Sequence, residues 1–430
     1  MGTLKGIHQW FKGKLVKSTL QLLSANVVAQ VIGFSVYPLL TRLYAPSDFG
    51  LLNLFLTLGG VLVLFATGAY YSAIVLPKQT SEGAACFHVG MLCNLCVTLL
   101  CALSVFFAPS IAQLLHVPSL ANWYFLLPLF VFLSATWQLL NYWYVRTHQF
   151  GAISAYQIGQ STLNSGAKWM FGATQFLQGG MLCAVVLAPL LSLLAVVMRS
   201  FVAIKPLFSV QWSQCKAMAH VYRKFPQFTL PKQLVNYMGG NMPILLLTPF
   251  FDLSYIGYFG MALTLSFVPL SVVTKSFYQV LFSDVTALVH KGASVWKNYR
   301  RLVGWSALLI TVSFTGLFFA LPSVTSWLLG ESWGVVGSYI QLMLPWLAII
   351  AITNTFDFIF DVFGKQDKQF YFEIALFVLR ALALLLGIYY QDFFLAVACF
   401  SAVSFVLRLV YATYQYYLLQ QYEKQRCKSN

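Results

Sequence analysis

Long apolar segments recur along this chain, and they constrain its fold more than any other feature. A helix needs about 20 largely apolar residues to cross the hydrocarbon layer of a bilayer. Segments of that kind lie at 18–41, 50–76, 84–108, 121–145, 150–174, 180–204, 230–251, 254–282, 301–322, 336–362, 369–390 and 393–418. The sequence therefore predicts an all-α polytopic membrane protein with about 12 transmembrane helices.

The composition excludes a soluble protein. Of 430 residues, 59% are hydrophobic and only 9% are charged, whereas soluble domains carry about 25% charged residues. The net charge of +15 would suit a nucleic-acid partner. However, the basic residues lie mostly in short connections between apolar segments, which is the pattern that orients a membrane protein. We therefore expect no nucleic-acid partner.

The basic residues occupy alternate connections, and this alternation predicts the orientation. One set of connections holds Lys5, Lys12, Lys14, Lys17, Lys78, Arg146, Lys205, Lys216, Arg223, Lys224, Lys291, Lys297, Lys365, Lys368, Lys424, Arg426 and Lys428. The other set holds almost nothing basic except Arg42. The positive-inside rule then places both termini in the cytoplasm, which requires an even number of spans.

A longer polar stretch at 205–229 divides the chain into two halves. We expect it to be a cytoplasmic linker between an N-terminal six-helix bundle, 18–204, and a C-terminal six-helix bundle, 230–418. Transporters commonly bind their substrate between two such halves, so we expect the bundles to surround a central cavity. Residues 419–430 are expected to form a cytoplasmic tail.

Residues 1–17 are expected to form a cytoplasmic amphipathic segment. Leu4, Ile7, Phe11 and Leu15 share one helical face, and the neighbouring lysines suit anionic lipid head groups. A disordered basic tail is the alternative.

Polar side chains inside the apolar segments are the candidates for a substrate site. A charge at the centre of a membrane helix costs about 2.5–3.5 kcal/mol if it faces lipid. Many of these residues recur at steps of three and four, which places them on one helical face. We expect them to face a watered cavity or a partner. The candidates are Asn26, Gln30, Arg42, Gln160, Asn164, Lys168, Lys275, Gln279, Arg380 and Arg408.

Structural roles are the alternative for two of these cations. Arg380 lies seven residues from Glu373 and could pair with it, while Arg408 could extend to the cytoplasmic interface. Lys168 and Lys275 have no acid within one helical turn, which favours a cavity role for both.

Two acids are candidates for energy coupling. Asp357 and Asp361 are four residues apart near the inner end of their span. Such a pair could bind a proton or a sodium ion. Alternatively, it could cap the helix end beside Lys365 and Lys368. No other cofactor and no metal site is expected.

Several motifs resemble a known family. The clearest lies at residues 37–50, YPLLTRLYAPSDFG, and others lie at 73–78, AIVLPK, and 222–226, YRKFP. They resemble the bacterial polysaccharide and O-antigen flippases of the multidrug/oligosaccharidyl-lipid/polysaccharide exporter superfamily. Two positions depart from that pattern: Ala69-Tyr70-Tyr71 stands where many members carry an arginine and a glutamate, and Lys275 follows the usual arginine position by one helix segment.

The resemblance implies a flippase rather than an enzyme. Its expected substrate is a polyprenyl-pyrophosphate-linked oligosaccharide, moved from the cytoplasmic to the outer leaflet by alternating access. Sugars and phosphates cannot cross hydrocarbon unaided, whereas amides and hydroxyls can replace their hydration and cations can hold the pyrophosphate. The implied location is the bacterial cytoplasmic (inner) membrane, with membrane lipids and other polysaccharide-assembly proteins as partners.

Three other functions remain open. A cation-coupled multidrug exporter of the same superfamily should carry acids in its cavity, yet the spans here lean basic. A membrane-embedded polysaccharide polymerase or ligase should present a long outer loop, yet the longest outer connections are 109–120 and 323–335. A peptidoglycan-precursor flippase is usually longer.

The orientation is testable with a reporter that is active only outside the cytoplasm. We expect activity from fusions after Arg42 or Leu321, and none from fusions after residue 210 or at the C-terminus, because lysine and arginine concentrate on one side. An active fusion at the C-terminus would contradict both the number of spans and the orientation.

Overall fold

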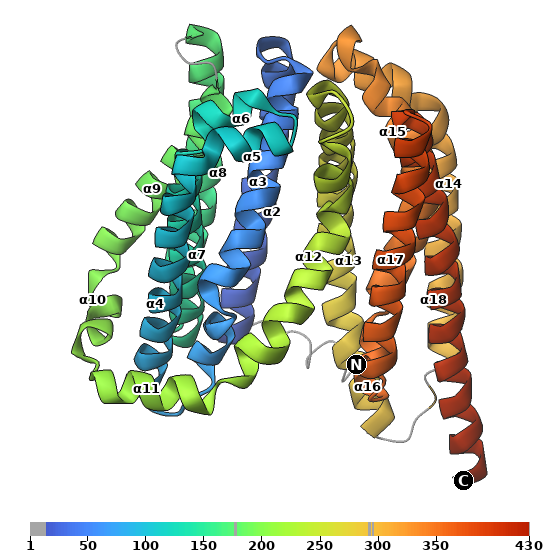
Figure 1. Ribbon diagram of the computed structural model, residues 1–430. Helices are drawn as coiled ribbons and strands as arrows, with labels where there is room; N and C mark the ends of the chain where they lie inside the picture. Colours follow the sequence, from blue (N-terminus) through green and yellow to red (C-terminus); the bar gives the residue numbers. More distant parts are fainter. Residues whose placement is uncertain (1–13, 176–178, 291–293, 295, 430) are drawn as a thin grey trace. The chain divides into compact units, whose positions relative to one another are not determined.

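The computed structural model describes residues 14–175, 179–290, 294 and 296–429 (Figure 1). Every regular element in these ranges is a helix, and no strand occurs within them. The all-α prediction is therefore confirmed. Residues 1–13 lie outside the described residues, so the amphipathic segment stays a prediction, and the first described helix begins at Lys14.

Twelve of the helices in the described ranges have 18 or more residues, in agreement with the expected number of spans. They are α2 (Lys14–Leu43), α3 (Pro46–Thr67), α4 (Thr80–Ser104), α7 (Leu126–Arg146), α8 (Phe150–Thr174), α9 (Gly180–Arg199), α12 (Leu230–Leu247), α13 (Leu253–His290), α14 (Trp296–Leu329), α15 (Gly334–Thr355), α17 (Gln366–Tyr389) and α18 (Phe393–Ser429). Nine segments of the described chain are both long and apolar enough to cross a membrane. The chain is thus a multi-pass membrane protein.

Short elements join the long helices. They are η1 (Tyr70–Val75), η2 (Val105–Phe107), α5 (Ala108–Leu114), α6 (Pro118–Trp123), α10 (Phe201–Ile204), η3 (Lys205–Ser209), α11 (Trp212–Val221), the π-helical turn η4 (Phe225–Thr229), η5 (Glu331–Trp333) and α16 (Phe358–Val362).

Several helix ends differ from the apolar segments identified in the sequence. The segment 50–76 is divided because Gly68 adopts a left-handed φ of +52° and ends α3, with its N–H donating to the Phe65 carbonyl. The segment 336–362 is divided between α15 and α16. At the other end, α18 continues as helix through most of the expected tail, to Ser429.

The chain folds into two compact units, Met1–Met238 and Gly239–Asn430. The division falls inside α12. Residues 205–229 form η3, α11 and η4 within the first unit. The assignment of six-helix bundles, linker and tail to sides of the membrane stays a prediction.

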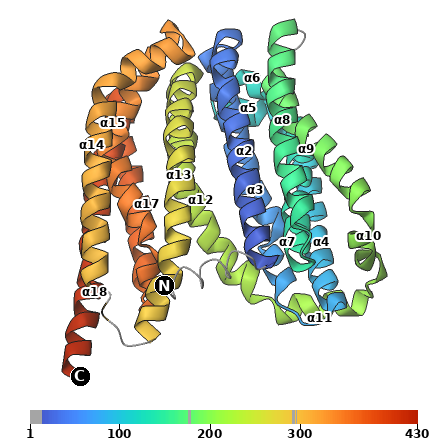
Figure 2. The same cartoon turned by 180° about the vertical axis from the view of Figure 1, so that it is seen from behind.

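In the first unit, α2 and α8 run side by side in the same direction (Figure 2). Near their beginnings Gly151 faces Gln21, farther along the Ser161 hydroxyl donates to the Ala29 carbonyl, and near their ends Gly172 meets Tyr44. Because Gly172 has no side chain, the Tyr44 ring can lie directly on the backbone of α8.

Helices α4 and α7 of the same unit are joined by a glycine contact and a polar contact. A Cβ at Gly90 would lie 2.5 Å from Leu139 Cδ2, so glycine permits the close approach of the two helices. Beside it the fully buried Asn94 donates through Nδ2 to the Phe132 carbonyl at 3.1 Å and to Thr136 Oγ1 at 3.0 Å. Small residues and interhelical amide bonds of this kind hold membrane helices together.

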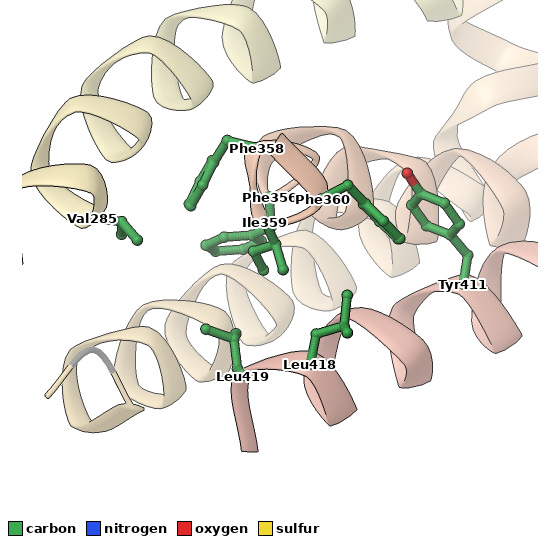
Figure 3. Close-up of a cluster of buried hydrophobic side chains, with 8 residues drawn as sticks. All are labelled: Val285, Phe356, Phe358, Ile359, Phe360, Tyr411, Leu418 and Leu419. Carbon is green, nitrogen blue, oxygen red and sulfur yellow. The ribbon is translucent and has the colours of Figure 1, made fainter. Parts of the chain in front are cut away.

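In the second unit, an aromatic cluster fixes α16 against α18. Figure 3 shows its buried members, Val285, Phe356, Phe358, Ile359, Phe360, Tyr411, Leu418 and Leu419. The Phe360 and Tyr411 rings stack with centroids 4.9 Å apart. This packing sets the position of the short segment between α15 and α16.

A buried ion pair joins α17 to α18 in that unit. Arg408 Nη2 lies 3.0 Å from Glu373 Oε1, and their side chains are 9% and 26% exposed. The guanidinium of Arg408 also lies 5.0 Å from the centre of the Tyr411 ring. Removing one partner would leave the other charge buried without compensation.

We therefore expect Glu373→Gln to lower the free energy of unfolding by up to about 3 kcal/mol, the low end for a buried pair because Glu373 is partly exposed. Replacing both residues by leucine should restore most of that loss. Chemical unfolding of the purified protein in detergent measures both effects.

The control for this experiment is Asp367→Asn on the same helix. Asp367 pairs with Lys368 at 3.9 Å, and both side chains are more than half exposed, so little stability should be lost. A double leucine variant no more stable than Glu373→Gln would contradict the assigned role of the pair.

Candidate functional site

The first candidate site is a polar stripe on α8, formed by Gln157, Ser161, Asn164 and Lys168. Ser161 contacts α2 through the Ala29 carbonyl, and Lys168 lies seven residues later, about two turns along the same face of the helix. The Tyr44 hydroxyl donates to the Lys168 carbonyl at 2.8 Å. The stripe therefore lies along the side of α8 that packs on α2.

Lys168 is buried without a counter-charge. Its side chain is only 9% exposed, and none of the ion pairs and hydrogen bonds among the described residues involves its ammonium. A cation in the interior of a membrane protein is costly, and such residues usually face a partner or a watered path. This agrees with the sequence-based expectation that Lys168 has no local acid.

Two amides of the same helix also lack partners. Gln157 Oε1 and Asn164 Oδ1 are buried acceptors with no hydrogen bond found in the described structure. The hydroxyls of Ser154 on α8 and Ser192 on α9 share this property. A buried polar atom without a partner costs about 1–3 kcal/mol, so such a group indicates a water or ligand that completes it.

Other predicted residues of the first unit lie in more open positions. Asn26 and Arg42 are exposed, while Gln30 and Gln160 are half-buried. Among the described residues, no hydrogen bond or ion pair joins these four side chains to Lys168. Ser192 could not be predicted as a site residue, because a single serine in an apolar segment does not indicate a site.

Arg380 on α17 lies beside two aromatic rings of the second unit, which contact each other edge to face with centroids 5.3 Å apart. Its guanidinium carbon is 5.0 Å from the ring centres of both Trp346 and Phe400. Its Nε donates to Ser404 Oγ at 2.8 Å and its Nη1 to the Gly239 carbonyl at 3.5 Å, while Nη2 lacks a partner. The cation is held chiefly by ring faces and neutral oxygens.

The two structural alternatives for the arginines are not what the structure shows. The Glu373 carboxylate accepts from Arg408 rather than Arg380. Arg408 is 8% exposed and remains inside the unit, so it does not extend to an interface. Two of its nitrogens, Nε and Nη1, still lack a partner. Substrate contact by either arginine stays a prediction.

Asp357 lies between α15 and α16, where Oδ1 receives two hydrogen bonds from α18. The Tyr411 hydroxyl donates at 2.7 Å and Gln415 Nε2 at 3.2 Å. Gln415 Nε2 also approaches the Thr353 carbonyl at 3.2 Å, and Gln369 Nε2 donates to the Tyr411 hydroxyl at 3.1 Å. Asp357 is thus part of a polar cluster that joins three helices.

Residues of this cluster extend a polar stripe that is visible in the sequence of α18. Ser401, Ser404 and Arg408 form a stripe on α18, and Tyr411 and Gln415 continue it at the same three- and four-residue steps. The side chains of Lys275, Gln279 and Asp361 lie outside the described residues, so their roles stay predictions. Within the described part of the chain, no group of three or more His, Cys, Asp or Glu residues could hold a metal ion.

The comparisons with known proteins agree with this picture. The family described as "Polysaccharide biosynthesis protein" matches residues 39–337. A curated relative, the "Succinoglycan biosynthesis transport protein ExoT" of Rhizobium meliloti (strain 1021), is 23% identical over 324 residues. The match covers 75% of this chain and 62% of the relative, so the chain spans less than two thirds of the relative's length.

Solved structures share the fold at low sequence identity. An inward-facing multidrug resistance MATE family transporter of the MOP superfamily has a TM-score of 0.74 and 14% identity, with coverage of 94% of this chain and 96% of that chain. The lipid II flippase MurJ in an inward closed conformation has a TM-score of 0.72 and 12% identity, with coverage of 94% and 87%.

These neighbours confirm the fold class, and the family match confirms the resemblance found in the sequence motifs. Because that match covers more than half of the chain, the chain belongs to the family of polysaccharide biosynthesis proteins.

Proposed function

We propose that this protein is a flippase that moves polyprenyl-pyrophosphate-linked oligosaccharide from the cytoplasmic to the outer leaflet by alternating access. The oligosaccharide would be an O-antigen or another surface polysaccharide repeat unit. The observation that carries the proposal is Lys168, a buried cation on the long helix α8 with no counter-charge found among the described residues, together with amides of the same helix whose oxygens lack partners.

The charge of Lys168 favours an anionic substrate. A pyrophosphate entering beside it would supply the missing counter-charge through charge-assisted hydrogen bonds. Gln157 and Asn164 carry the unpartnered oxygens of the same stripe, which would accept from sugar hydroxyls. A cationic drug would meet repulsion from the same ammonium, so the drug-exporter alternative is less well supported.

The named relatives support the class of activity without identifying the substrate. One is described as a transport protein of succinoglycan biosynthesis and another as a lipid II flippase. We place the protein in the bacterial inner membrane with both termini in the cytoplasm. Its partners would be membrane lipids, the lipid-linked oligosaccharide and other polysaccharide-assembly proteins.

The test replaces Lys168 in proteoliposomes that contain a fluorescent polyprenyl-pyrophosphate oligosaccharide. Loss of one charge-assisted contact of about 1.5–3 kcal/mol should slow flipping roughly 10- to 100-fold in Lys168→Ala. Lys168→Arg should retain part of the rate, because the charge survives while the geometry changes. Protein amount and thermal stability are measured in parallel.

The matched control is Lys216→Ala on α11, where the lysine is exposed; its rate should equal that of the wild type. Flipping by Lys168→Ala at the wild-type rate would exclude Lys168 as a substrate contact.

We extend the proposal to energy coupling at Asp357. Its Oδ1 accepts from both Tyr411 and Gln415, so protonation of this oxygen would remove the acceptor that the two donors share. The contacts between α18 and the short segment that joins α15 to α16 would then change. This would couple a proton to a rearrangement inside the second unit, with a sodium ion as the alternative.

Under an imposed proton gradient, Asp357→Asn should flip at the rate seen without any gradient, because the amide cannot take up the proton. Asp392→Asn is the control, since Asp392 is exposed and its Oδ1 only caps the start of α18. Acceleration of the Asp357→Asn variant by the proton gradient would contradict the coupling role. Acceleration of the wild type only by sodium would identify sodium as the ion.

A further inference from the structure

A cavity of about 470 Å³ lies within the first unit, at the ends of α2 and α8. Its walls come from the connection between α2 and α3, from α6, and from the last turn of α8. The volume falls within the range of about 300–1,000 Å³ that ligand pockets occupy. Lys168 does not line this cavity, so the proposed binding of pyrophosphate at Lys168 does not explain it.

Two aromatic rings of this cavity pack directly against glycine backbone. A Cβ at Gly179, which has a φ of +90°, would overlap the indole of Trp123. A Cβ at Gly172 would lie 2.6 Å from Cε2 of Tyr44. The glycines therefore let the backbone support both rings, and the bond from the Tyr44 hydroxyl to the Lys168 carbonyl fixes one of them further.

The polar groups of the cavity are almost all neutral. Ser119, Asn122 and Gln175 line it, and no hydrogen bond of their side chains is found in the described part of the chain. Together they offer hydroxyl and amide groups that can both donate and accept. The one charged group is the carboxylate of Asp48, whose Oδ2 accepts from the Ala45 N–H at 3.0 Å.

From these features we infer that the cavity is a binding site for a neutral hexopyranose. A sugar ring presents an apolar C–H face and a rim of hydroxyls. The apolar face matches an aromatic ring such as that of Trp123, and the rim matches amides, hydroxyls and a carboxylate. No cation lines the cavity, and Asp48 would repel a uronic acid or a phosphorylated sugar.

Tyr44 keeps its hydrogen bond to the Lys168 carbonyl over the whole physiological pH range. Burial, with a smaller contribution from the Asp48 carboxylate, raises the pKa of Tyr44 to about 12. Its hydroxyl therefore stays protonated and keeps its bond to α8.

The inference rests on the proposed function in one respect: it takes the sugar to belong to the exported oligosaccharide. With the expected orientation, the connection after Arg42 faces outward, so the cavity would hold a sugar that has already crossed the membrane. A sugar head group of an envelope glycolipid would have the same chemistry, and the experiment distinguishes the two sources.

Binding is measured by saturation-transfer NMR on the full chain in a polyoxyethylene detergent, which carries neither a sugar nor a quaternary ammonium. The probes are the methyl glycosides of glucose and galactose, methyl glucuronide and tetramethylammonium. We expect transfer to a neutral glycoside, at least threefold weaker transfer to the glucuronide, and a smaller difference between them in Asp48→Asn.

Trp123→Ala should reduce the glycoside signal at least fivefold, and Asn122→Ala, a change at an exposed position, should also reduce it. Trp169→Ala is the matched control, because Trp169 is 51% exposed on α8 and does not line the cavity. Three results would overturn the inference: no transfer to any glycoside, an unchanged signal in both cavity variants, or a stronger signal from tetramethylammonium than from the glycosides.

The same variants are then tested for flipping of the fluorescent oligosaccharide. Slower flipping by Trp123→Ala assigns the sugar to the exported chain, whereas lost glycoside binding with unchanged flipping assigns it to a membrane glycolipid. A wild-type protein that binds glycosides but does not flip contradicts only the proposed function. A wild-type protein that flips but binds no glycoside contradicts only this site.

Discussion

The structure depends on how the protein compensates buried cationic side chains, because the interior of a membrane protein solvates a charge poorly. Arg408 has a carboxylate from the neighbouring helix at 3.0 Å, and Arg380 lies beside two aromatic rings with a serine at its Nε. Lys168 has neither. These three buried cations therefore have three different environments, and among them only Lys168 has neither a hydrogen bond to its charged group nor a ring contact found among the described residues. This difference is the reason that we propose Lys168 as the substrate contact.

The same constraint explains why some features could be predicted from the sequence and others could not. Each span must cover the hydrocarbon mostly with apolar residues, so the approximate number of helices could be predicted from the apolar segments. Among the described residues, three of the twelve long helices, α7, α8 and α12, are too polar to be identified by a strict hydropathy criterion. Helix ends are decided locally and by packing. The segment 50–76 is apolar throughout, yet α3 ends early because Gly68 turns the backbone to a left-handed φ of +52°. Hydropathy does not detect that turn.

The partners of buried charges were the least predictable feature. Glu373 and Arg380 share a helix and a face, but seven residues separate them by roughly 10 Å along the axis, too far for a direct bond. A residue of the adjacent helix, Arg408, reaches Glu373 instead. Asp357 likewise receives two hydrogen bonds from α18, a helix distant in the sequence. Contacts of this kind depend on which helices are neighbours, and one sequence alone does not contain that information.

Tyr44 connects the two candidate sites of the first unit, the polar stripe at Lys168 and the cavity at the ends of α2 and α8. Its ring lies on Gly172 and lines the cavity, while its hydroxyl holds the backbone of α8 at Lys168. A pyrophosphate beside this buried cation would bind strongly, because water and salt screen a buried ion pair less than an exposed one. The cavity contains mainly neutral groups, and neutral hydrogen bonds contribute only about 0.5–1.5 kcal/mol each. If the proposed function holds, strong binding of a pyrophosphate at Lys168 and weak binding of a sugar at the helix ends would suit a carrier that must release its cargo. A shift of α8 at Lys168 would move one wall of the cavity with it.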